Sequence, residues 1–189
     1  MQQLAHNDIP RLRPESLESV DRHPVRLFLD NIRSAHNVGS MLRTADGLLL
    51  DAVIMAGFTP DGTHRGVHKA ALGAQDFVPW STTENPEAAL LAMKAQGWTI
   101  AALEITSAPR QVADLDAGNF PLVIVAGNEV DGVSPEVLAV CDLALELPQY
   151  GAKQSLNVAV SAGVSCYDAV RHFRSLTGLP SFPDHDPRP

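Results

Sequence analysis

The stretch that decides the fold is PLVIVAG at residues 121–127, which runs directly into NEVDGVSP at residues 128–135. Its centre, residues 122–126, is apolar without interruption, which is typical of a strand buried on both faces of a sheet. Ser134 and Pro135 then mark the start of a helix predicted over Ser134–Val140. A buried strand that leads through a glycine-containing turn into a helix is the repeating unit of an α/β protein.

The same unit recurs along the chain. The predicted strands are residues 25–29, 52–57, 98–103, 121–127 and 142–147, and further helices are predicted from Asn37 onward, over 84–96 and over 155–174. The segment 58–68, with its glycine, proline and histidine, is predicted to be a loop. We therefore expect an α/β fold with a mostly parallel sheet flanked by helices. Its parts are a short N-terminal arm (1–24), the main domain (25–174) and a proline-rich C-terminal tail (175–189).

Composition sets the class of protein. With 189 residues and 45% hydrophobic residues, the chain has the size of one α/β domain. It contains no apolar run of about 18 residues, and residues 1–24 lack the apolar centre of a signal peptide. We expect a soluble, cytoplasmic protein with no membrane partner. Cys141 and Cys166 lie in apolar surroundings without metal-ligand spacing, which predicts buried reduced thiols and no metal site.

The net charge of −8 argues against a nucleic-acid partner, but the charges are unevenly distributed. Residues 1–70 hold eight Lys or Arg against eight Asp or Glu, whereas residues 84–146 hold two against ten. The first part of the chain can therefore form a local cationic surface, although scattered solvated charges are the simpler alternative. The residues available for it are Arg11, Arg13, Arg26, Arg33, Arg43, Arg65 and Lys69.

The helix at HNVGSMLRTAD, residues 36–46, carries the first unusual motif. Asn37 is predicted to cap it, and Gly39 and Arg43 follow on one stripe away from the apolar face. The glycine allows something to approach closely, and Arg43 points outward beside it. A plain surface arginine is the alternative. A dinucleotide-binding fingerprint is excluded because it needs three glycines in this turn.

Two loops at the carboxyl ends of predicted strands carry the other motifs, and ligands of open α/β sheets collect at that edge. The loop 127–134 places Glu129 and Asp131 there; acids repel phosphate and suit a neutral or cationic ligand, although a simple turn has the same composition. The loop 147–157 leads into a helix rich in small residues, with Ser155 as its predicted cap.

Taken in this order, the three stretches resemble the SpoU-type (TrmH-like) branch of the SPOUT RNA methyltransferases. The family pattern N-x-G-x-x-x-R-[ST]-A corresponds to residues 37–45, G-x-E-x-x-G-[VL]-S to 127–134, and [IL]-P-x-x-G-x-x-x-S-L-N-V to 147–158. The likeness covers about residues 25–174. It implies an α/β sheet with a C-terminal trefoil knot, S-adenosylmethionine held in the knot, and a homodimer paired across it. It also implies methylation of a ribose 2′-hydroxyl in tRNA or rRNA.

The resemblance also assigns roles to residues. The cofactor-binding residues that it implies are Leu103, Glu104, Gly127, Asn128, Leu147, Pro148, Ser155 and Leu156. It places Arg43 at the catalytic step, together with Asn37, Glu129, Ser155 and Asn157. Because an arginine pKa above about 12 makes a poor base at neutral pH, we expect Arg43 to clamp a phosphate and stabilise the developing oxyanion. The proton then passes to an RNA phosphate or to solvent; Arg43 acting as the base is the alternative.

The neighbours of Arg43 have supporting roles in this interpretation. We expect Asn37 and Asn157 to orient Arg43 and the ribose, and Glu129 to fix the loop or Asn37 by hydrogen bonds. The residues predicted to contact RNA are Arg11, Arg13, Arg33, Arg43, His64, Arg65, His68 and Lys69. An RNA base methyltransferase and a non-catalytic RNA-binding or assembly protein of the same fold remain alternatives. The sequence does not specify which RNA is the target.

Overall fold

The computed structural model describes residues 3–5, 9, 12 and 14–180 of the chain. One sheet has the strand order β3-β2-β1-β6-β4-β7-β5, and every neighbouring pair is parallel. Its strands are β1 (His23–Asp30), β2 (Leu50–Ala56), β3 (Trp80–Thr83), β4 (Thr99–Leu103), β5 (Pro109–Arg110), β6 (Leu122–Ala126) and β7 (Leu143–Leu145). The predicted parallel α/β sheet is confirmed. The trefoil knot stays a prediction.

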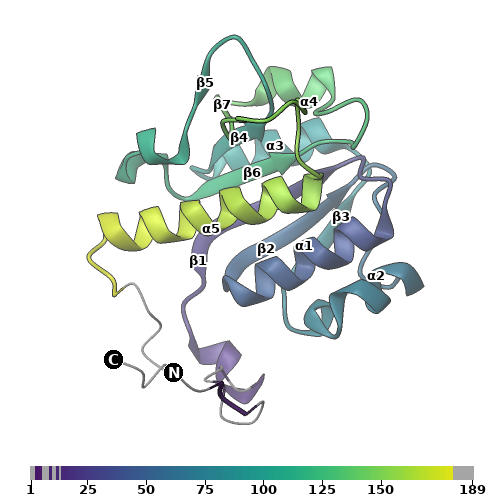
Figure 1. The fold of residues 1–189 in the computed structure, drawn as a ribbon, viewed down its shortest axis with the longest axis vertical. Helices are drawn as coiled ribbons and strands as arrows, with labels where there is room; N and C mark the ends of the chain where they lie inside the picture. Colours follow the sequence, from purple (N-terminus) through teal and green to yellow (C-terminus); the bar gives the residue numbers. More distant parts are fainter. Residues whose placement is uncertain (1–2, 6–8, 10–11, 13, 181–189) are drawn as a thin grey trace.

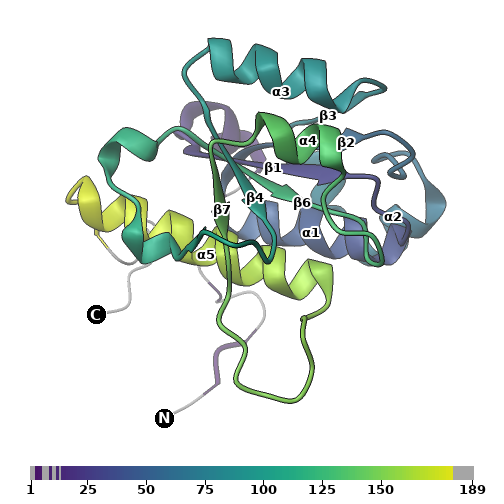
Figure 2. The same cartoon turned by 90° about the horizontal axis from the view of Figure 1, so that it is seen from above.

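Helices cover both faces of the sheet (Figure 1). They are α1 (Ala35–Gly47), α2 (Arg65–Ala71), α3 (Pro86–Ala95), α4 (Pro135–Val140) and α5 (Val158–Leu176), with short 3-10 turns at Pro14–Ser19, Ala74–Asp76, Val112–Asp114 and Ala117–Asn119. Helices α1 and α5 lie on one face, and α3 and α4 lie on the other (Figure 2). Among the described residues, no helix combines the length and the apolar character needed to cross a bilayer.

The central strand β1 shows why this layering is stable. Its register pairs Phe28 with Ile54 of β2 and with Val125 of β6, and all three side chains face α3 and α4. Leu27 and Leu29 point to the opposite face, toward α1 and α5. Because successive side chains of a strand alternate between faces, the apolar residues of this strand supply a core on both sides of the sheet.

Several predicted boundaries need correction. Helix α2 begins at Arg65, inside the segment 58–68 that we predicted to be a loop. Strands β3 and β5 were not predicted, because both are short and lie at the sheet edges, where burial imposes no apolar pattern. The predicted arm and tail lie partly outside the described residues, so these domain boundaries stay predictions. The two cysteines are free, with Cys166 buried and Cys141 partly buried, as predicted.

Candidate functional site

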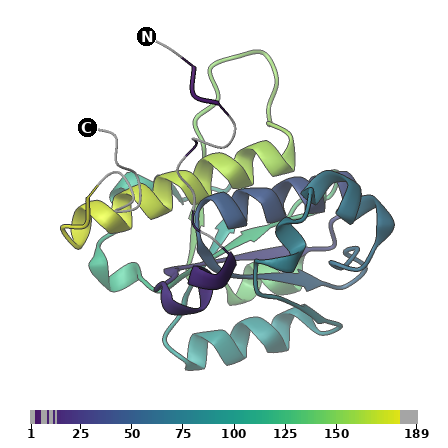
Figure 3. The ribbon, with the colours of Figure 1, turned by 90° about the horizontal axis from the view of Figure 1, so that it is seen from below.

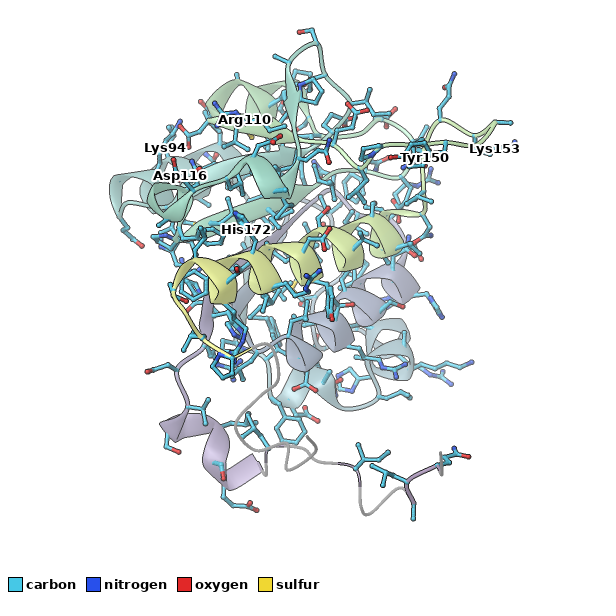
Figure 4. The ribbon with its side chains drawn as sticks, turned by 60° about the vertical axis from the view of Figure 1, so that its left-hand side comes forward. Lys94, Arg110, Asp116, Tyr150, Lys153 and His172 are labelled. Carbon is cyan, nitrogen blue, oxygen red and sulfur yellow. The ribbon has the colours of Figure 1, made fainter. Side chains whose placement is uncertain are left out.

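A cleft of about 590 Å³ opens at the carboxyl ends of β4, β6 and β7. Its walls are the ends of these strands, the β6–α4 loop (127–134) and the β7–α5 loop (146–157). The β7–α5 loop projects from the domain (Figure 2), and Tyr150 and Lys153 point outward from it (Figure 4). This is the edge at which open parallel sheets bind ligands.

The predicted cofactor residues gather at this cleft. Those that line it are Leu103, Glu104, Gly127, Asn128, Leu147, Ser155 and Leu156. Pro148 belongs to the same loop but is not part of the lining. Seven of the eight predicted residues, which come from three separate segments of the chain, therefore share one cavity.

The charge of the cleft is strongly one-sided. Four carboxylates line it, from Glu104, Glu129, Asp131 and Glu146, whereas the lining includes no lysine, arginine or histidine. A phosphate-bearing ligand would be repelled by such a wall. The cleft therefore suits a ligand that carries positive charge, as expected from the acids of the β6–α4 loop.

The β6–α4 loop is tightly folded, and two glycines allow this. A Cβ at Gly127 would collide with the backbone at Val133, and Gly132 has φ +73°, a conformation that favours glycine. Glu104 at the end of β4 holds the loop by accepting a hydrogen bond from the Val133 N–H at 3.0 Å. Its other carboxylate oxygen accepts from the Ile105 N–H at 2.9 Å. Glu104 is therefore a structural anchor of the cleft as well as part of its wall.

A cluster of three side chains joins the three sequence motifs. The Asn37 amide donates to Glu129 Oε1 at 2.8 Å, and the Asn157 amide donates to Asn37 Oδ1 at 3.3 Å. Glu129 also accepts from the backbone N–H groups of Arg33 and Ser34, both at 3.0 Å. The start of α1, the β6–α4 loop and the start of α5 therefore meet at one point on the rim of the cleft.

These hydrogen bonds shift the titration of Glu129. Its partial burial is the largest single influence and by itself raises the carboxyl pKa. The hydrogen bonds from the Arg33 and Ser34 backbones and from the Asn37 side chain oppose that effect. Together they hold the pKa of Glu129 below its ordinary value, because they stabilise the charged form. Glu129 is therefore an acceptor for this cluster at neutral pH.

Two predicted helix caps are wrong. The N-cap of α1 is Ser34, whose hydroxyl accepts from the Asn37 N–H, so the Asn37 side chain is free to bind Glu129. The N-cap of α5 is Asn157, whose Oδ1 accepts from the Ala159 N–H at 2.9 Å. Ser155 lies two residues earlier, in the exposed loop. In both cases several polar residues precede the helix, and spacing alone does not identify which one caps it.

Ser134 does occupy the predicted N-cap position of α4, but its side chain makes no capping bond. Its backbone N–H instead donates to Asp30 Oδ2 at 2.8 Å. Asp30 is fully buried at the end of β1, and its other oxygen accepts from the Asn31 amide at 2.9 Å. Sequence reasoning missed Asp30; an acid that directly follows a buried strand was the available signal.

The close approach expected at Gly39 is confirmed, but Gly39 is buried and does not share an exposed stripe with Arg43. The segment that approaches it closely is helix α2, because a Cβ at Gly39 would lie 2.6 Å from both Ala70 Cβ and the Val67 carbonyl oxygen. Gly66 approaches Ala35 in the same way. The first turns of α1 therefore pack closely against α2, and the two helices lie next to each other in Figure 3.

Arg43 lies on the exposed side of α1, six residues after Asn37, or about 9 Å along the helix axis. It forms no ion pair within the described residues, and it does not line the cleft. The structure thus brings Asn37, Glu129 and Asn157 together and places Ser155 in the cleft wall, while Arg43 stays apart from them with its guanidinium in solvent.

The residues predicted to contact RNA are exposed where the structure describes them. These are Arg33 in the β1–α1 loop and His64, Arg65, His68 and Lys69 in or next to α2. Arg26 does not belong to this surface: it pairs with Asp51 at 2.5 Å and lies 4.0 Å from the Trp98 ring centroid. Arg11 and Arg13 lie outside the described residues.

An all-parallel sheet with an acidic cleft at its carboxyl edge and an amide–carboxylate cluster on the rim defines a ligand-binding α/β domain. The model of the SpoU rRNA methylase family matches residues 24–167. The chain belongs to this family, as its three motifs predicted.

Individual relatives agree with this assignment. The chain is 31% identical to the tRNA (guanosine(18)-2′-O)-methyltransferase of Aquifex aeolicus, over 93% of this chain and 81% of that protein. It is 35% identical to the 23S rRNA (guanosine-2′-O-)-methyltransferase RlmB of Neisseria meningitidis serogroup B, over 78% of this chain but 58% of that protein. A crystal structure of the AdoMet-bound rRNA methyltransferase of Sinorhizobium meliloti is similar, with a TM-score of 0.74, 26% identity, and coverage of 82% and 60%.

Proposed function

We propose that this chain transfers a methyl group from S-adenosylmethionine to a ribose 2′-hydroxyl of tRNA or rRNA. The observation that carries the proposal is the Asn37–Glu129–Asn157 cluster, because it unites all three family motifs at the rim of one cleft. Two relatives that the chain matches are named for 2′-O-methylation of guanosine, one in tRNA and one in 23S rRNA.

The cleft fits the cofactor in size and charge. Its volume of about 590 Å³ lies within the range of small-molecule sites, and its four carboxylates suit a cation. When bound, S-adenosylmethionine supplies an electrophilic methyl group on a positively charged sulfur. The lining residues Gly127, Leu147, Ser155 and Leu156 would hold it, with Pro148 shaping the same loop and Glu104 fixing the opposite wall.

Arg43 lies outside the acidic cleft, on the exposed side of α1, and we assign its positive charge to the RNA. A ribose 2′-hydroxyl must lose its proton as it attacks, and an arginine with a pKa above about 12 is a poor acceptor for that proton. The exposed guanidinium is instead suited to clamp an RNA phosphate and to stabilise the oxyanion. The proton then passes to a phosphate or to solvent.

The cluster acts on Arg43 through the backbone. Glu129 binds the two N–H groups just before α1, and Asn37 is held at both ends of its amide. These bonds fix the start of the helix that carries Arg43. We therefore assign Asn37, Glu129 and Asn157 as positioning residues and Arg43 as the catalytic one. Ser155 lines the cleft and is a further candidate for contact with the reacting groups.

The proposal includes pairing of two chains. Helix α5 exposes Val160, Val164 and Tyr167, and Val164 and Tyr167 form an apolar groove with Leu48 at the end of α1. Val164→Asp should shift a dimer toward monomer in sedimentation velocity, since it places a charge in an apolar contact. RNA targets and reduced cysteines both fit a cytoplasmic location.

RNA binding is assigned to the exposed cations near α1 and α2, with Arg11 and Arg13 of the arm as further candidates. Reversing two of these charges with Arg65→Glu and Lys69→Glu should weaken RNA binding and flatten its salt dependence, because fewer counterions are released. If the double variant binds RNA as tightly as the wild type at every salt concentration, this surface does not contact RNA.

The direct test is a methylation assay with purified protein, radiolabelled S-adenosylmethionine and unmodified tRNA and rRNA transcripts, followed by digestion to nucleosides. A 2′-O-methyl nucleoside supports the proposal, whereas a base-methylated nucleoside assigns the chain to base methylation. Failure to bind S-adenosylmethionine in calorimetry would favour a non-catalytic RNA-binding protein. Mapping 2′-O-methyl sites in RNA from cells with and without the gene then identifies the target.

A further inference from the structure

We propose that Phe58, in the connection between β2 and α2, is a stacking platform for a base of the RNA substrate. This inference rests on the proposed function and adds a binding contact that the family motifs do not contain. Phe58 follows Gly57 at the carboxyl end of β2, on the same edge of the sheet as the cleft.

The exposure of Phe58 is built into the fold. Its side chain is 62% exposed, although burying a phenylalanine normally stabilises a folded protein. The backbone around it is nevertheless firmly held. The Phe58 N–H donates to Asn31 Oδ1 at 3.3 Å, and Gly57 has φ +63°, with no room for a Cβ next to the Asn31 side chain.

The next residue anchors the segment in the core. The Thr59 hydroxyl is buried and accepts from the Ile32 N–H at 2.9 Å. Its single proton is shared between the Leu29 and Ala56 carbonyls, which lie at 3.0 and 2.8 Å. Because these hydrogen bonds hold the segment 57–59 in place, the exposure of the Phe58 ring is not a result of a flexible backbone. The structure instead presents the ring on a fixed support, which lowers the entropy lost when a ligand stacks on it.

Two hydrogen bonds to Asn31 link Phe58 to the cleft. Asn31 accepts from the Phe58 N–H through its side chain and from the Asn128 amide through its carbonyl at 2.7 Å. Asn128 lines the cleft, and its neighbour Glu129 binds the backbone of Arg33. Phe58 therefore lies beside the reaction site, where a nucleotide flanking the methylated ribose would pass.

The surroundings of the ring favour RNA over a protein partner. His64 and Arg65 lie six and seven residues after Phe58, and Arg33 directly follows Ile32, whose N–H donates to the Thr59 hydroxyl. All three are exposed and form no ion pair within the described residues. Of the acids close to Phe58, Asp61 binds Thr63 and Asp30 is buried. Glu84 is exposed and follows Thr83, whose carbonyl accepts from the Gly57 N–H. Within residues 57–68, Phe58 is the one large apolar side chain that is exposed. An isolated ring among cations matches the stacking and phosphate contacts of single-stranded RNA.

The test compares two RNA probes. One is a fluorescein-labelled 12-nucleotide single-stranded RNA of mixed sequence, and the other has the same length but lacks its bases. Base stacking predicts that Phe58→Ala weakens binding of the first probe by between about fivefold and about a hundredfold and leaves the second unchanged. Phe58→Trp should restore binding, whereas Phe58→Leu should not.

Controls separate this contact from general damage. Phe77→Ala removes a ring that is 41% exposed just before β3, at the opposite edge of the sheet, and should leave both probes unaffected. Affinity for S-adenosylmethionine and the melting temperature should stay unchanged in Phe58→Ala.

Three results would overturn the inference: equal loss of both probes, full binding by Phe58→Leu, or a change of oligomeric state in Phe58→Ala, which would indicate a protein contact. If the wild-type protein discriminates between the probes but methylates no RNA, the stacking site is supported and the proposed reaction is contradicted. Wild-type protein that methylates RNA, combined with any of these three results, would retain the proposed reaction and reject the stacking site.

Discussion

The Asn37 amide donates to Glu129 Oε1 at 2.8 Å, a contact between residues 92 positions apart that links the helix of Arg43 to the loop lining the cleft. Asn37 is 9% exposed, whereas Glu129 is exposed at the rim. The pair therefore couples a buried helix start to a surface loop. Its loss would affect both stability and the placement of Arg43.

Removing Glu129 should destabilise the fold measurably. Glu129→Ala deletes a carboxylate that accepts three hydrogen bonds, and we expect a loss of about 1–3 kcal/mol in the free energy of unfolding in urea. A double-mutant cycle with Asn37→Ala should give a non-zero coupling energy, since the residues are in contact. Glu84→Ala, at an exposed glutamate without a hydrogen bond to other described residues, is the control. Strict additivity of Asn37→Ala and Glu129→Ala would contradict the interaction.

The Glu129 carboxylate also makes the free energy of unfolding depend on pH in the acidic range. Its folded-state pKa is below the ordinary value of 4.5, so the folded state binds fewer protons than the unfolded state in this range. The stabilisation is complete above pH 4.5 and is lost as the pH falls through the lower folded pKa. The difference in unfolding free energy between wild type and Glu129→Gln should therefore be constant at neutral pH and shrink in acid. A difference that grows on acidification would reverse the assigned direction.

Arg43 should affect turnover without affecting cofactor binding. Arg43→Ala removes the proposed phosphate clamp and should lower kcat/KM by about 10²- to 10³-fold, with the Kd for S-adenosylmethionine unchanged because Arg43 does not line the cleft. Arg43→Lys should also be impaired, since lysine cannot form the bidentate contact. Arg110→Ala on the edge strand β5 is the matched control. Near-normal turnover by Arg43→Lys would contradict the proposed bidentate contact between Arg43 and an RNA phosphate.

The sequence predicted the sheet well because continuous apolar strands such as residues 122–126 must be buried on both faces wherever they lie. The glycines and acids of the loop 127–134 indicated one ligand-binding edge, whereas the full set of cleft residues came from the family resemblance. Short edge strands were missed because their side chains are partly exposed. Strand β3, with the sequence WSTT, carries no apolar pattern to read.

The internal details of the site were less predictable. Whether Ser34 or Asn37 caps α1 depends on Glu129, which lies 92 residues away and attracts the Asn37 amide. The purpose of Gly39 depends on α2, whose approach no local pattern reveals. Both are tertiary contacts that override the local preference of a residue.

The cysteines should be unreactive in the folded protein. Burial raises the pKa of both the Cys141 and the Cys166 thiol to about 12, and Asp142 adds to the effect at Cys141. Because the thiolate is the reactive form, a disulfide reagent such as DTNB at pH 8 should label neither in native protein and both in guanidinium chloride. Ser81→Cys, at an exposed position in β3, should react quickly and serves as the control. Fast labelling of native Cys166 would mean that α5 opens readily.

The packing of α1 on α2 should tolerate no side chain at Gly39. Gly39→Ala places a Cβ 2.6 Å from Ala70 Cβ and the Val67 carbonyl oxygen, so the helices must separate, and we expect a loss of about 1–3 kcal/mol of stability. Gly47, in the same helix, has nothing within 4 Å of an added Cβ. Gly47→Ala should be neutral or stabilising by up to about 1 kcal/mol, because alanine favours the helix. Urea unfolding of the two variants checks both expectations. If Gly39→Ala and Gly47→Ala are equally stable, helix α2 can move away from α1 at little cost in free energy. The displaced α2 should then also alter RNA binding, because it carries Arg65 and Lys69.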